Sequence, residues 1–124
     1  MRAKIFLFSG ALFLSLGMGQ ASAHTTLIAS TPSKGAILKT APSNISLKFE
    51  EPLLTLKGHI INKITLTDPK NANIALGKIV VSGASVTAQI LTRVTTLGKY
   101  RVTYRVAAQD GHVVTGSFLF TLQN

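Results

Sequence analysis

Cysteine and tryptophan are both missing from this sequence, and acidic residues are scarce, with four Asp and Glu among 124 residues. Without cysteine the chain can form no disulfide and can offer no thiolate to a metal ion. Methionine is nearly as rare, because both copies, Met1 and Met18, lie within residues 1–23. If that segment is removed, the remaining chain contains no sulfur at all.

The 13 Lys and Arg residues outnumber the four acids and give the chain a formal charge of +9. A basic balance can indicate binding to nucleic acids or to anionic lipids. Here the cations are spread along the chain with no run of three, and Lys99, Arg101 and Arg105 alternate with apolar residues, as on the solvated face of a strand. The pattern favours an ordinary solvated surface, and we expect no binding to nucleic acid.

The long apolar run at the start of the chain is not typical of a membrane anchor. It extends from Ile5 to Met18, follows the cations Arg2 and Lys4, and is too short to span a bilayer. The small residues at 21–23, Ala-Ser-Ala, form a cleavage site of the A-x-A kind. We therefore predict a secretory signal peptide over 1–23, export through the Sec route, and one mature domain over 24–124 that is not embedded in a membrane.

Alternation of apolar and polar residues dominates the rest of the sequence. Successive side chains of a β-strand point to opposite faces, so each alternating run offers one apolar face. Turn-forming pairs such as Asp68-Pro69 and Ser82-Gly83 separate the runs, and no stretch shows a convincing helical period. The sequence predicts an all-β fold, an antiparallel sandwich or barrel, with strands that include 45–49, 64–66, 86–90, 100–106 and 118–122.

Cleavage after Ala23 would make His24 the first residue of the mature chain. An N-terminal histidine offers a free α-amine and a ring nitrogen, which together can close a chelate ring around a metal ion, an arrangement called a histidine brace. The amine titrates close to neutral pH, so its proton is displaced by a metal at little cost. The alternative is that a histidine follows the cleavage site by accident.

Asp110 and His112 form a second candidate, in the segment AQDGH that ends at His112. Asp-Gly is a common hairpin turn, so one interpretation is a simple turn after which His112 begins the next strand. If the alternation of the preceding strand continues instead, Asp110 and His112 lie on one side of the chain and can bind a ligand together. A turn can break that alternation, so both interpretations stay open.

Glu51 and His59 are the remaining polar candidates. Glu51 continues the apolar face of the 45–49 run and precedes Pro52, a place where a buried carboxylate needs a partner. It either swings out at the strand end or orients a metal-binding imidazole or amine without touching the metal itself. His59 follows Lys57 and Gly58 in an expected loop, and we predict that it is exposed and binds no metal.

Two stretches together resemble the CopC family of copper-resistance proteins. Residues 24–53, HTTLIASTPSKGAILKTAPSNISLKFEEPL, are similar to the family's N-terminal His, S-x-P-x-x-G-x-x-L and A-P-x-x-(V/I)-x-L-x-F-x-E-P-L. Residues 98–112, GKYRVTYRVAAQDGH, are similar to its G-x-Y-x-V-x-(W/Y)-R-V…D-G-H end. The resemblance covers essentially all of 24–124, and its strength lies in the ordered combination.

The resemblance implies an immunoglobulin-like, Greek-key β-sandwich in the periplasm that binds Cu(II). It implies that His24 supplies its amine and ring nitrogen, His112 a second imidazole and Asp110 a carboxylate oxygen, with Glu51 close to the N-terminal histidine. Three nitrogens and one oxygen suit Cu(II) better than Cu(I), which prefers sulfur. Some family members carry a separate Met-rich Cu(I) site, but this sequence lacks the methionines for one, so we expect one Cu(II) ion per mature chain.

In function, the resemblance implies a protein that sequesters or carries copper beside a CopD-like permease of the inner membrane. One alternative is a histidine-brace copper enzyme of the monooxygenase kind. That chemistry needs an open copper position and usually a flat aromatic surface, whereas Trp is absent and Asp110 would occupy the position that oxygen requires. The other alternative is a purely structural immunoglobulin-like module, which explains the strands but not His24 at the cleavage point. We expect no enzymatic activity.

Overall fold

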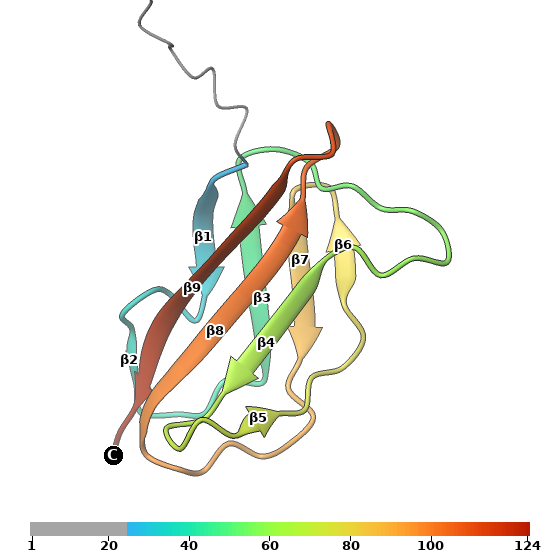
Figure 1. Cartoon of the computed structure of the whole chain (residues 1–124). Helices are drawn as coiled ribbons and strands as arrows, with labels where there is room; N and C mark the ends of the chain where they lie inside the picture. The colour runs from blue at the N-terminus through green and yellow to red at the C-terminus, as the bar shows by residue number, and fades with distance from the viewer. Residues whose placement is uncertain (1–24) are drawn as a thin grey trace, which may run out of the picture.

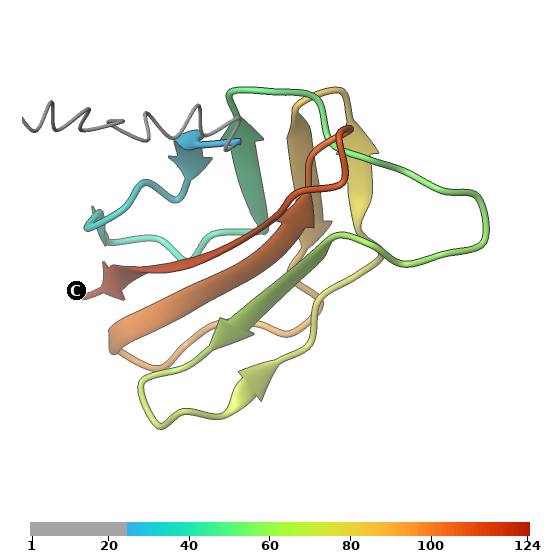
Figure 2. The same ribbon diagram turned by 45° about the horizontal axis from the view of Figure 1, so that its top comes forward.

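The computed structural model describes residues 25–124, which form two β-sheets packed face to face (Figures 1 and 2). The four-stranded sheet has the order β1 (Leu27–Thr31), β3 (Asn44–Phe49), β7 (Ser85–Gln89) and β6 (Val80–Ser82). The five-stranded sheet has the order β2 (Ile37–Leu38), β9 (Val113–Leu122), β8 (Gly98–Ala107), β4 (Lys63–Thr67) and β5 (Asn73–Ile74). Segment 1–23 and His24 lie outside the described residues.

The predicted all-β sandwich is confirmed, and its pairings are antiparallel with one exception. β2 is a short edge strand that runs parallel to β9, whereas the other strand pairs of its sheet are antiparallel. Within residues 25–124 there is no helix long and apolar enough to cross a membrane.

The core lies between the sheets and follows from the alternation in the sequence. On β8 the inward residues Tyr100, Val102 and Val106 are buried, while the cations between them face solvent. The ring of Tyr100 stacks on Phe120 of β9 with a centroid distance of 5.2 Å. The fifteen residues of the buried core cluster all lie between Ile45 and Leu122. The described part of the chain therefore contains its own hydrophobic core.

The hairpin of β8 and β9 is the longest element of the sandwich. Its ladder pairs Gly98 with Leu122 at one end and Ala107 with Val113 at the other, without a shift of register between them. The turn that joins the two strands contains Asp110 and His112, so this ladder sets the position of that turn at one end of the sandwich (Figure 1).

Candidate metal centre

The Asp110–His112 turn brings a carboxylate and an imidazole into direct contact. Asp110 Oδ2 lies 2.7 Å from His112 Nδ1, and the backbone N–H of His112 donates to Asp110 Oδ1 at 3.0 Å. Gly111 has a φ of 90°, a conformation that glycine adopts without strain, and this lets the chain reverse between the two residues. The side chains are 63% exposed for His112 and 39% exposed for Asp110, so an ion from solvent can reach both.

Both interpretations of this segment hold in part. Asp110-Gly111 does form the turn of a hairpin, in which Gly111 N–H donates to Ala108 O and Ala108 N–H donates to His112 O. The alternation of β8 ends before the turn, because Ala107 and Ala108 are both buried. Asp110 and His112 nevertheless lie on one side of the chain, on the exposed surface rather than on the inward face.

The hydrogen bonds of the turn keep the carboxylate ionised. The backbone N–H of His112, followed by its imidazole, holds the pKa of Asp110 below its usual range. A carboxylate that stays charged over the neutral range is a ready oxygen donor for a divalent cation. Because one imidazole nitrogen faces Asp110, the ring is oriented with Nε2 turned away from the carboxylate.

Three segments far apart in the sequence meet at this end of the sandwich. The backbone N–H of Glu50 donates to Thr26 O at 2.8 Å, which attaches the start of the described chain to the end of β3. Leu53 forms an isolated bridge with Ala108. Figures 1 and 2 both show the first described residues, the end of β3 and the β8–β9 turn at the same end of the molecule.

Asn62 holds the segment beside the turn in place, and the sequence analysis did not identify it. Its Nδ2 donates to Leu54 O at 2.9 Å, and its Oδ1 accepts from the N–H of Ala107 at 3.0 Å. Leu54 N–H in turn donates to Ala107 O at 2.8 Å, so one buried amide joins the 53–62 segment to the end of β8 just before the turn. One feature of the sequence could have identified Asn62: it is two residues before Ile64 and four before Leu66, so strand alternation places this polar residue on the buried face.

The other predicted residues divide between this end and the rest of the surface. Glu51 is half-buried two residues beyond the end of β3, between the Thr26 contact and the Leu53 bridge. Its carboxylate forms no ion pair with another residue of 25–124. His59 is exposed in a loop, as predicted, and its backbone N–H donates to Leu56 O at 3.0 Å.

Residues 25–124 do not make a complete metal site by themselves. Within this range no group of three or more His, Cys, Asp or Glu side chains is close enough to hold an ion. The Asp110–His112 pair offers one imidazole and one carboxylate, so any further donors have to come from elsewhere. Thr25 is fully buried, and His24 directly precedes it outside the described residues.

Comparison with known proteins supports a single family. Residues 27–123 match the CopC domain model. The chain is 29% identical over 122 residues to copper resistance protein C of Pseudomonas syringae pv. tomato, covering 96% of this chain and 94% of that protein. It is 30% identical over 112 residues to copper resistance protein C of Xanthomonas campestris pv. juglandis, covering 88% and 87%. These relatives are named for copper resistance and not for a catalysed reaction.

Solved structures agree on the fold. PcoC of Escherichia coli, described as a methionine-rich copper resistance protein, superposes with a TM-score of 0.65 at 28% identity, covering 82% of this chain and 100% of that one. CopC of Methylosinus trichosporium OB3b superposes with a TM-score of 0.68 at 22% identity, covering 81% and 94%. With the family domain matched from strand β1 to the residue after β9, this chain belongs to the CopC family.

Proposed function

We propose that the mature protein binds one Cu(II) ion at the end of the sandwich that carries the Asp110–His112 turn. His24 supplies its α-amine and a ring nitrogen, His112 a second imidazole and Asp110 a carboxylate oxygen. The observation that carries the proposal is the exposed 2.7 Å pair of Asp110 and His112, at the same end as the start of the described chain. The protein sequesters or carries this ion in the periplasm and catalyses no reaction on it.

The path of the chain supports a role for His24. Thr25 is fully buried, and Thr26 O accepts from the N–H of Glu50, so the described chain begins at this end of the sandwich. The α-amine of His24 becomes a donor when cleavage leaves it as the first residue. Its amine and ring then add two nitrogens to the imidazole and carboxylate of the turn, a set that suits tetragonal Cu(II).

Asp110 can serve as a ligand while it holds His112. Each carboxylate oxygen has two lone pairs, so accepting one hydrogen bond on Oδ1 and one on Oδ2 leaves positions for a cation. We assign Glu51 to a supporting role, in which its half-buried carboxylate orients the amine or ring of His24.

The absence of sulfur limits the proposal to one oxidation state. Residues 24–124 contain neither cysteine nor methionine, whereas the E. coli relative is described as methionine-rich. Nitrogen and oxygen donors favour Cu(II), and Cu(I) selects soft thioethers and thiolates. We therefore propose a single Cu(II) site. A CopD-like permease of the inner membrane is the partner that would receive or supply the ion.

The test is a Cu(II) titration of the protein that begins at His24, followed by electron paramagnetic resonance. A second preparation keeps one extra residue before His24, which turns the amine into an amide and leaves every other donor in place. We expect one tight site with nitrogen couplings in the first preparation and markedly weaker binding in the second. Equal affinity in the two would remove the α-amine from the site.

Two substitutions locate the site within the fold. His112→Ala should weaken Cu(II) binding sharply, because it removes an imidazole donor and the partner of Asp110. His59→Ala should leave the affinity unchanged, since His59 lies in the separate loop between Leu53 and Asn62. The reverse result would place the copper site at the loop and not at the turn.

A further inference from the structure

The loop of residues 54–61 projects from the body of the sandwich. It is the green segment that extends to the right in Figures 1 and 2. Its base is fixed by the bonds of Leu54 and Asn62 to Ala107, and by the bond from Leu53 N–H to Gly83 O at 2.9 Å. Its tip turns at Gly58, with a φ of 80°, between Leu56 and His59, which form a bridge. The loop therefore projects from the sandwich while hydrogen bonds hold its base in place.

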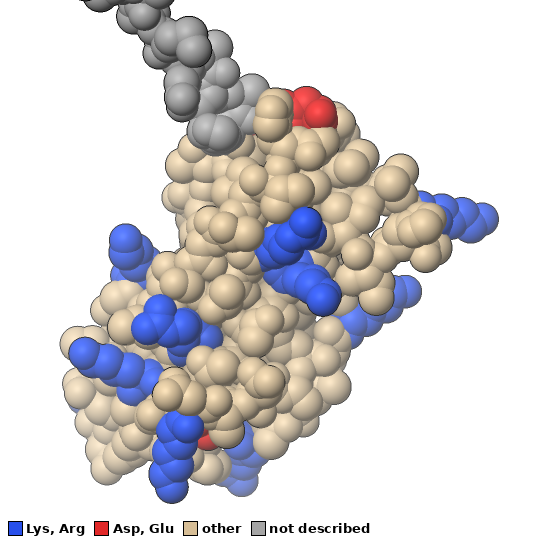
Figure 3. Space-filling view, viewed as in Figure 1, with Lys and Arg blue, Asp and Glu red and all other residues tan. Residues whose placement is uncertain are grey.

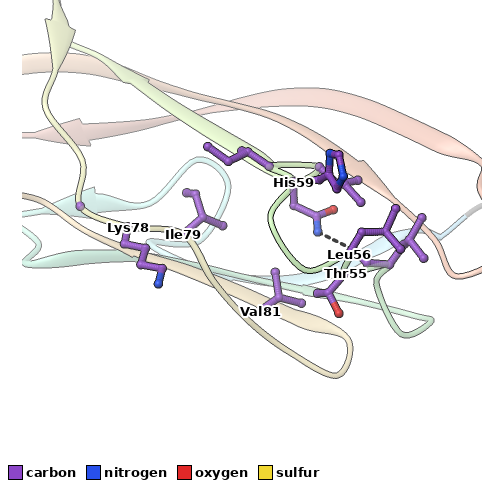
Figure 4. A pocket seen from close by; sticks show the side chains of 11 residues that line it. Thr55, Leu56, His59, Lys78, Ile79 and Val81 are labelled. Atoms are coloured by element: carbon purple, nitrogen blue, oxygen red, sulfur yellow. Dashed lines mark hydrogen bonds between the residues drawn. The ribbon is translucent and has the colours of Figure 1, made fainter.

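Large aliphatic side chains are exposed on and beside this loop. Ile60 is 83% exposed and Leu56 is 53% exposed, and both line the same hollow as the partly exposed Ile79 and Val81. Between the loop and the 77–81 segment lies an open hollow of about 430 Å³ with a largely aliphatic lining (Figure 4). Apolar side chains gathered in one place on a surface mark an interaction site more often than isolated ones do.

The charged residues of the loop and of the lining of the hollow are cationic. Lys57 lies at the tip of the loop, Lys78 lines the hollow opposite it (Figure 4), and Lys63 follows the loop at the start of β4. The sequence contains no acid from Pro52 to Thr67. Acidic atoms are also sparse on the face shown in Figure 3, where Lys and Arg side chains lie across the strands. Charge complementarity therefore favours an occupant that is both apolar and negatively charged.

A second copy of the chain does not meet this requirement. In a twofold dimer the same patch would face itself, so Lys57 and Lys78 of both copies would be brought together with no carboxylate among them. A fluid surface of acyl chains and phosphate groups offers both the apolar and the anionic groups that would match these side chains.

We infer that the 54–61 loop docks the protein on an anionic lipid surface. Leu56 and Ile60 enter the boundary between headgroups and acyl chains, and Lys57, Lys63 and Lys78 lie among the lipid phosphates. Aliphatic burial and cation–phosphate attraction act together in peripheral binding of this kind. Because the loop base is bonded to Ala107, docking also fixes the orientation of the Asp110–His112 turn relative to the membrane. The inference does not depend on copper binding.

The test is sedimentation of the copper-free protein with lipid vesicles. The protein begins at His24, because the apolar run in residues 1–23 would itself bind lipid and the described fold contains its own core. We expect binding to vesicles of phosphatidylglycerol mixed with phosphatidylcholine, weakened by added salt, and little binding to phosphatidylcholine alone. No binding to the anionic vesicles, or equal binding to both kinds, would overturn the inference.

Matched variants assign the binding to the loop. Ile60→Ser and Lys57→Glu should each lower vesicle binding about tenfold. Ile37→Ser on β2 and Lys48→Glu on the outer face of β3 make the same chemical changes at exposed positions of the rest of the sandwich, and both should bind as the parent does. All these side chains are exposed, so the thermal unfolding midpoint should stay the same. Equal loss in the controls, or no loss with Ile60→Ser, would overturn the inference.

Discussion

At the scale of single residues, Asp110 would contribute to the proposed copper site in two ways. Asp110 fixes the ring of His112 through Oδ2 and the backbone of His112 through Oδ1. It also brings a negative charge that its lowered pKa preserves. A substitution that removes only the charge of Asp110 therefore tests the contribution of that charge to copper binding.

Asp110→Asn should lower Cu(II) affinity by at least about 10–100-fold, the loss typical when a partner that orients a metal-binding histidine is removed, because Asp110 is proposed to be a ligand as well. The amide oxygen can still accept from the His112 N–H, so the turn keeps its shape while the charge is lost. Titration of the protein that begins at His24 measures the change, with His59→Ala as the matched control. An affinity equal to that of the parent would show that the carboxylate takes no part in binding.

Asn62 is the residue on which the geometry around the turn depends. Asn62→Ala removes a donor from Leu54 O and an acceptor from Ala107 N–H in a buried place. We expect the free energy of unfolding to fall by about 2–4 kcal/mol, because buried polar groups lose their partners. Denaturant titration measures the loss. Asn73→Ala, at an exposed position of β5, should stay within about 0.5 kcal/mol of the parent; a similar loss there would contradict the assignment.

At the scale of elements, the β8–β9 hairpin depends on one glycine opposite a tyrosine. Gly116 of β9 pairs directly with Tyr104 of β8, and the phenol ring lies over the space that a side chain at 116 would need. The same ring packs edge-on against Phe49 of β3 with a centroid distance of 5.4 Å. The small residue on one strand thus permits an aromatic contact between the two sheets.

Gly116→Ala should destabilise the fold by about 1–3 kcal/mol, because the new methyl group would force the ring of Tyr104 from its place against Phe49. Gly77→Ala is the comparison, since a methyl group there would meet Leu91 and Gln89 at ordinary contact distances of 3.5 and 3.6 Å. Thermal unfolding of the two variants measures the difference. Equal midpoints would show that Tyr104 can move aside freely.

The elements also show where sequence patterns were sufficient. The long inner strands were predicted because alternation over five or more residues identifies a half-buried strand, as in the run from Tyr100 to Val106. The short edge strands β2, β5 and β6, of two or three residues each, were not predicted. β1 was also missed, because its Ile28 and Ala29 are exposed and its ladder contains a register shift.

The candidate site was predicted residue by residue but not as an arrangement. Motif and spacing identified Asp110 and His112, yet the bond between them depends on a turn that ends the alternation at Ala107. The contribution of Asn62 depends on a contact with Ala107, 45 residues away in the sequence, which no local pattern reveals. The metal-binding roles of His24, Asp110 and His112, and the supporting role of Glu51, remain predictions.

At the scale of the whole molecule, burial of the tyrosines makes stability sensitive to alkaline pH. Burial raises the pKa of both Tyr100 and Tyr104 above the usual value of a phenol. A pKa that is higher in the folded state means that the folded chain keeps protons that the unfolded chain loses. This contribution is complete below the unfolded pKa, which is about 10, and is lost as the pH rises toward the folded values.

We therefore expect the free energy of unfolding to decline as the pH rises above about 10. Denaturant titrations at increasing pH, with tyrosinate absorbance recorded in parallel, measure this decline. Tyr104→Phe should reduce its slope, because one of the groups with a raised pKa is removed. Lys48→Gln, at an exposed position of β3, is the control and should leave the slope unchanged. A slope that is the same in Tyr104→Phe would exclude the tyrosines as its cause.

Because the ladder of β8 and β9 is unbroken, the sandwich and the Asp110–His112 turn should open on different timescales. Amide hydrogens in the middle of a long, buried ladder exchange with solvent only when a large unit of the protein opens. The turn with Asp110 and His112 lies beyond the last pair of that ladder, in water, and can open by itself. At the proposed Cu(II) site, an ion can therefore bind and leave without unfolding of the sandwich.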